Sequence, residues 1–276
     1  MLKTYILMAL ACAAPSFAQQ RFDSADAAVQ AVIDAAGSHD TAKLSAILGP
    51  KASAILTSGN PSQDKAEQSE FAQLAGAKHQ VTFDLRDSNR AILLIGDLDW
   101  PFPVPLIHAN GKWSFDPSQT KVEMDARLVG THELDAIEIC AGYVEAQHKY
   151  ASQAPDKDGL MTYASSIASG AFPREFQEAV WDAQKRPVKP YHGYYFRMLT
   201  AQGTHARGGE HNYLVKDKLV GGFALLAWPA QYGVTGIHTF MVNQDGVIYQ
   251  KDLGPQSAAE SAVKRFDPDP TWSRVD

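Results

Sequence analysis

The sequence is poor in cysteine, in clustered basic residues and in long apolar runs, and each shortage excludes a class of protein. Two cysteines among 276 residues exclude a fold that is held together by several disulfides. The formal charge is −6, and the densest basic stretch, 185–189, carries only three charges beside prolines. Nucleic-acid binding would require a basic face, so nucleic acid is not expected as a partner.

The first eighteen residues have the pattern of a secretory signal. Lys3 precedes an apolar, uncharged run over 5–14, and Ser16 and Ala18 supply the small residues of a cleavage site. The run is too short to cross a hydrocarbon core of about 30 Å. We therefore predict a signal peptide over 1–18, cleaved after Ala18, and a periplasmic mature chain without a transmembrane helix. In the alternative, Cys12 is lipidated and anchors the chain as a lipoprotein.

The first part of the mature chain has helical patterns followed by strand patterns. Apolar spacing predicts helices over 22–48, with a break at 37–40, and over 64–75. Strand alternation follows in four short segments, at 81–85, 91–95, 104–107 and 112–115. Asn110-Gly111 is a strong signal for a tight hairpin. We predict an α+β domain over 19–118, with N-terminal helices and a curved antiparallel meander.

The second part begins with one long helix. Apolar spacing predicts it over 121–152, with Gly130-Thr131 as a point of interruption, and a short helix over 174–184. Strand patterns then occur at 193–199, 223–228, 235–242 and 247–250. We predict that residues 119–255 form a second α+β domain, in which the long helix packs on an antiparallel sheet. Residues 256–276 are expected to be a C-terminal tail. Cys140 lies in the apolar part of the long helix, and we expect a buried, inert thiol.

Two resemblances support this layout. Three blocks resemble the DUF2950 family of exported bacterial proteins of unknown function: Gly193-Tyr-Tyr-Phe-Arg197, the glycine- and tryptophan-containing 221–233, and Asp245-Gly-Val-Ile-Tyr-Gln-Lys-Asp-Leu-Gly-Pro255. This resemblance covers most of the mature chain and implies an exported Gram-negative protein, without implying an activity. The helix 132–150 and the later strands also resemble the globular part of type IV pilins and type II secretion pseudopilins. That likeness implies a fold rather than a function.

Chemical motifs are scarce. The sequence has no Gly-x-Ser-x-Gly elbow, no His-Glu-x-x-His and no phosphate loop. His205, Glu210 and His211 lie in a glycine-rich segment, where they could form the polar or metal centre of an envelope hydrolase. Their spacing matches no short ligand motif, so we predict neither a metal nor a cofactor.

Aromatic residues are concentrated in the strands of the second part. Because alternate residues of a strand face opposite sides, Tyr194 and Phe196 share one face and Tyr195 lies on the other. One face must pack on the long helix, and the other could offer a surface to a glycan or a protein. Ordinary core packing also accounts for many of these rings. Tyr194, Trp228 and Tyr232 are the predicted binding residues.

These observations together favour a non-enzymatic binding or assembly module of the cell envelope. Its expected partner is another envelope protein or a glycan. An envelope hydrolase centred on 205–211 is the alternative. A pilus-like subunit is a third hypothesis, but the polar start Gln19-Gln20-Arg21 lacks the long apolar helix with which pilins assemble.

Overall fold

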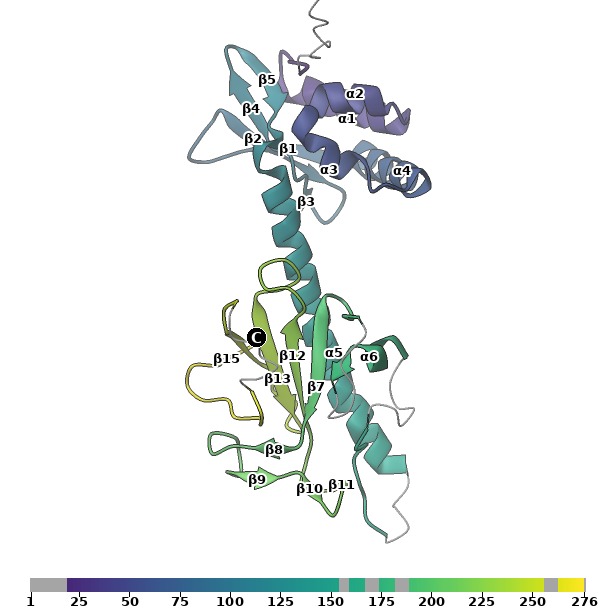
Figure 1. Cartoon of the computed structure of the whole chain (residues 1–276). Coiled ribbons are helices and arrows are strands. Elements are labelled where there is room, and N and C mark those ends of the chain that lie inside the picture. Colours follow the sequence, from purple (N-terminus) through teal and green to yellow (C-terminus); the bar gives the residue numbers. More distant parts are fainter. Residues whose placement is uncertain (1–18, 154–158, 167–173, 182–188, 256–262, 276) are drawn as a thin grey trace, which may run out of the picture. The chain divides into compact units, whose positions relative to one another are not determined.

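The computed structural model of the chain describes residues 19–153, 159–166, 174–181, 189–255 and 263–275 (Figure 1). The predicted signal peptide, and with it the alternative lipidation of Cys12, lies outside these residues. The chain divides into two compact units, Met1–Met124 and Asp125–Asp276. Within the described ranges, none of the helices combines the length and the apolar character that a membrane span requires.

The N-terminal unit begins with helices. They are α1 (Ala25–Gly37), α2 (Thr41–Leu48), the 3₁₀ turn η1 (Pro50–Ala52), α3 (Ser53–Leu56) and α4 (Pro61–Ala77). Local chemistry explains where they start. The side chains of Ser24, Asp40 and Asn60 accept hydrogen bonds from backbone N–H groups of the first turns of α1, α2 and α4. Such caps satisfy donors that a helix leaves unpaired at its start.

An antiparallel sheet follows in the N-terminal unit. Its strands are β1 (His79–Phe83), β2 (Arg90–Ile95), β3 (Trp100–Pro101), β4 (Leu106–Ala109) and β5 (Lys112–Phe115), in the order β1-β2-β4-β5, with β3 also paired to β2. Asn110 and Gly111 connect β4 to β5 and have φ values of 54° and 72°. Positive φ at both central residues is the requirement of a two-residue hairpin turn, so the predicted hairpin is confirmed.

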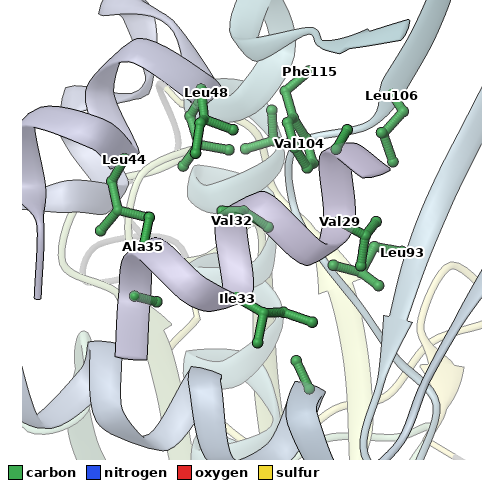
Figure 2. Packing of buried hydrophobic residues seen from close by; sticks show 14 of the residues in the cluster. Val29, Val32, Ile33, Ala35, Leu44, Leu48, Leu93, Val104, Leu106 and Phe115 are labelled. Carbon is green, nitrogen blue, oxygen red and sulfur yellow. The ribbon is translucent and has the colours of Figure 1, made fainter. Parts of the chain in front are cut away.

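The core of the N-terminal unit lies between the helices and one face of this sheet. Val29, Val32 and Ile33 form the buried side of α1. Figure 2 shows them between residues of α2 and residues of the sheet, which include Leu44, Leu48, Leu93, Leu106 and Phe115. The burial of Ala91, Leu93 and Ile95 alternates with partly exposed neighbours along β2, as expected for a strand with one buried face.

The C-terminal unit has a long helix on a sheet. Helix α5 (Thr120–Gln153) is continuous in the structure, so the expected interruption at Gly130-Thr131 is absent from it. The sheet consists of β6 (Val180–Trp181), β7 (Tyr194–Leu199), β12 (Ala224–Pro229), β13 (His238–Asn243), β14 (Tyr249–Asp252) and β15 (Ser273–Arg274), in the order β15-β14-β13-β12-β7-β6. Neighbouring strands are antiparallel except for β6 and β7. The predicted α+β class, with a long helix packed on an antiparallel sheet, is confirmed.

The helix packs on one face of the sheet through residues at helical spacing (Figure 1). Ala136, Cys140 and Tyr143 of α5 are buried against Tyr194 and Phe196 of β7. Positions i, i+4 and i+7 lie on one side of a helix, so this contact follows from the sequence pattern. The later helix α6 (Arg174–Glu178) is shorter than the predicted 174–184, because the chain enters β6 at Val180.

The opposite face of the sheet is covered as well. Leu199, Leu226 and Met241 on this face pack with Tyr213 and Phe266. The cover comes from Ala206, Tyr213 and Leu219 and from the segment 263–275. The first three lie in the region that also holds the short strands β8 (Ala201–Gln202), β9 (His211–Asn212), β10 (Leu214–Val215) and β11 (Lys218–Leu219). Residues 224–228 of β12 are therefore buried on both sides. Of the two alternatives for this face, a binding surface or core packing, the structure shows core packing. Residues 256–276 were predicted to be a tail, but the described part, 263–275, completes this core.

Candidate functional site

A cavity of about 460 Å³ in the N-terminal unit could hold a ligand. Its wall is mostly apolar and comes from α1 to α4, from β2 and β3, and from Met124. Pockets for small molecules usually have volumes of about 300–1,000 Å³ and mainly apolar linings with a few polar groups. The cavity fits this description.

The cavity exists because α4 supplies few large buried side chains. Ala75 is the fully buried residue of α4, and Ala72 faces α1, where a Cβ on Gly37 would lie 3.7 Å from its Cβ. The large apolar side chains of α4 that reach the cavity are Phe71 and Leu74, and Leu74 stays 47% exposed. Small residues thus let α1 and α4 pack closely at this point, and no large side chain of α4 fills the space beside the contact.

Aromatic rings from α4, from β3 and from the residue after β3 form part of the wall of the cavity. Phe71 and Phe102 lie with their centroids 5.2 Å apart and their planes tilted by 48°. Phe102 in turn contacts Phe115 of the core, at a centroid distance of 6.1 Å. Trp100 of β3 also lines the cavity and is half exposed. Contact with the core gives this wall a fixed geometry, while Trp100 and Leu74 leave apolar surface in contact with solvent.

The polar groups of the cavity come from the start of α4 and the loop before it. The carboxylate of Asp64 accepts hydrogen bonds from Ser58 Oγ at 2.6 Å, from Ser58 N at 2.7 Å and from Thr57 Oγ1 at 3.0 Å. The bonds from the Ser58 side chain and backbone hold the pKa of the Asp64 carboxyl below its ordinary value. Glu67 and Glu70 also line the cavity, so its polar rim carries negative charge.

The aromatic residues predicted to bind a partner do not form one surface. Tyr194 is 0% exposed and belongs to the core under α5, where its hydroxyl donates to the carbonyl of His238 at 2.9 Å. Trp228 is 7% exposed and belongs to the core on the opposite face of the sheet. Tyr232 is 38% exposed, and its hydroxyl donates to Asp252 at 3.1 Å. Of these three residues, Tyr232 is the one that reaches solvent.

The polar residues at 205–211 have separate partners. His205 Nδ1 lies 3.0 Å from a carboxylate oxygen of Asp267, and Glu210 forms an ion pair with Arg265. The ring nitrogens of His211 each lie 3.2 Å from a backbone carbonyl, those of Gly209 and Gly221. In the part of the chain that the structure describes, no group of three or more His, Cys, Asp and Glu residues is arranged to hold a metal ion. Local pairing therefore explains these side chains.

A polar cluster that was not predicted lies between α5 and the sheet. Glu133 Oε1 accepts from the backbone N–H groups of Ile237 and His238 at 2.8 and 2.9 Å, and the His238 ring lies 3.2 Å from both oxygens. His192 Nδ1 lies 2.7 Å from Asp135. The Glu133–His238 pair is separated by 105 residues in sequence, so no local pattern could indicate it. These contacts attach α5 to the beginning of β13.

A family model described as a protein of unknown function (DUF2950) matches residues 19–182 and 173–275. The search of curated proteins and the search of solved structures returned no match.

Proposed function

Since the chain belongs to the DUF2950 family, whose description carries no activity, we propose its role from its own geometry: an exported, non-enzymatic protein of the cell envelope that binds an apolar small molecule. The cavity of about 460 Å³ in the N-terminal unit is the observation that carries this proposal. Its export is proposed from the signal pattern of residues 1–18.

The lining supports binding by burial of apolar surface. A ligand in the cavity would cover the exposed parts of Leu74 and Trp100, besides contacting Phe71 and Phe102. Removal of apolar surface from water stabilises a complex by roughly 25 cal/mol per Å². Because the aromatic side chains of the wall are already held by the core, binding does not have to order them, and this avoids a cost in conformational entropy.

The chemistry of the lining supports binding rather than catalysis. Among the described residues around the cavity there is no histidine or cysteine, the residue types that most often act as general base or activated nucleophile. Hydrogen bonds lower the pKa of the Asp64 carboxyl at the cavity. A general acid at neutral pH requires the opposite shift.

The cavity can be tested with a neutral fluorescent probe. We expect the purified mature chain to bind N-phenyl-1-naphthylamine saturably, with energy transfer from Trp100. Leu74→Gln should weaken binding about fivefold, because a half-exposed leucine contributes about 1 kcal/mol of apolar contact. Leu98→Gln is the matched control, since Leu98 is exposed in the same unit and lies outside the lining. Probe binding that is absent, or equal in both variants, would refute the proposal.

A further inference from the structure

The charges around the cavity are all of one sign, and this gives the class of the ligand. Asp64, Glu67 and Glu70 line the cavity, and the lining contains no Lys, Arg or His among the residues that the structure describes. The three acids are spaced by three residues on α4, so they lie along one side of that helix. We propose that the ligand is a cationic amphiphile, with an apolar body in the cavity and an ammonium-type head at these carboxylates. This proposal rests on the proposed function.

The three carboxylates have different roles in this arrangement. Asp64 is held by Ser58 and Thr57 through three hydrogen bonds, so it supplies a fixed negative charge at the start of α4. Glu67 accepts one hydrogen bond from Gln63 at 2.9 Å through Oε1, which leaves Oε2 as an acceptor. Glu70 makes no hydrogen bond or ion pair with any described residue. Glu67 and Glu70 are therefore the groups that can turn toward a cationic head.

The same arrangement disfavours an anionic amphiphile. A carboxylate or sulfate head at the rim would lie beside like charges, with no cation in the described lining to compensate them. Like charges at short range repel, and the repulsion between exposed groups decreases as salt increases. The expected order of affinity is therefore cation, then neutral molecule, then anion. The difference between cation and anion should shrink at high ionic strength.

The test compares amphiphiles that share one alkyl chain and differ in the head. Isothermal titration of the full mature chain would use decyltrimethylammonium, 1-decanol and decyl sulfate, each below its micelle concentration, at low and high salt. We expect the cation to bind at least about tenfold more tightly than the anion at low salt. The double variant Glu67→Gln/Glu70→Gln should reduce this ratio to about twofold or less, because the mobile carboxylates are gone.

A second double variant separates local charge from net charge. Asp26→Asn/Asp97→Asn removes the same number of charges from exposed positions of the N-terminal unit that lie outside the cavity, and it should keep the preference of the natural chain. Saturable binding of 1-decanol without a preference for the cation, or an equal loss in both double variants, would overturn the inference and leave the proposed function standing. Failure of all three amphiphiles to bind would overturn both.

Discussion

Asp64 shows how one carboxylate organises a loop. Its three hydrogen bonds come from Ser58 and Thr57, which precede α4, while Asp64 itself lies in the first turn of α4. An acid in the first turn of a helix is also favoured by the helix dipole. The loop before α4 is thereby held against the helix, and this defines one side of the cavity mouth.

Loss of one of these bonds should change the titration of Asp64. Its folded pKa is lowered, so the linked stability is present above the unfolded pKa, near about 3.9, and is lost as pH falls through the folded pKa. Ser58→Ala removes the largest cause of the shift, and we expect the pKa of Asp64 to rise toward its ordinary value. NMR titration of the carboxyl measures this. Ser62→Ala, nearby on α4, should leave the pKa unchanged, and an unchanged value in Ser58→Ala would contradict the account.

The faces of the aromatic residues in β7 were predictable from the sequence, but the exposure of Trp228 was not. Strand alternation placed Tyr194 and Phe196 on one face and Tyr195 on the other, and the two cores contain them in that way. It could not show that Trp228 is covered, because the cover includes Phe266, far away in sequence. The expected burial of Cys140 is confirmed, and burial raises the pKa of its thiol to about 12.

The loop between β12 and β13 depends on a close approach that glycine permits. A Cβ on Gly236 would lie 2.2 Å from the Tyr194 hydroxyl oxygen, which is closer than any non-bonded contact can be. The absence of a side chain lets the backbone pass over the ring of Tyr194, whose hydroxyl then reaches the carbonyl of His238 at 2.9 Å. This loop thus connects β13 to the core under α5.

An alanine at this position should destabilise the C-terminal unit. We expect Gly236→Ala to displace the Tyr194 hydroxyl and to lower the free energy of unfolding by about 1–3 kcal/mol, as overpacking does in well-packed cores. Gly142→Ala is a control of opposite sign, because nothing lies within 4 Å of its added Cβ and alanine is the better helix former by about 1 kcal/mol. Urea unfolding measures both. Equal effects of the two substitutions would contradict this interpretation.

Elements with strong local signals were predictable, and short ones were not. The Asn110-Gly111 turn and the long helix α5 carry hairpin chemistry and sustained apolar spacing, and both are in the structure. The paired strands β8 to β11 have two residues each, too few to show an alternating pattern. The parallel pairing of β6 with β7 also lacks a local signature, because it depends on how the chain returns to the sheet.

Across the whole chain, the apolar residues gather in separate cores within the two compact units. The cavity in the N-terminal unit was not predicted. Phe71 and Leu74 have the helical spacing of ordinary core residues, and only the packing of α4 beside α1 leaves space next to them. The predicted partner, an envelope protein or glycan, stays a prediction, with Tyr232 as the exposed residue of the three that were proposed to contact it.

The proposed export of the chain predicts the mass of the protein that is recovered from cells. After expression of the full sequence in a Gram-negative host, we expect periplasmic protein whose first residue is Gln19, because Ser16 and Ala18 match the pattern of a cleavage site. Intact-mass spectrometry of the periplasmic fraction checks this. A lipidated chain that begins at Cys12 would favour the alternative. Uncleaved protein in the cytoplasm would contradict export altogether.

The late segment 263–275 has a consequence for the order in which the chain can fold. The described core of the N-terminal unit ends at Phe115, so this unit has its core residues long before synthesis reaches the second sheet. The C-terminal unit must wait for Phe266, whose backbone pairs with Ala201 and Gly203. Domains generally fold in turn from the N-terminus. Until Phe266 has been synthesised, the side of β12 that carries Leu226 and Trp228 lacks part of its cover. Its apolar side chains are then exposed and could bind a chaperone.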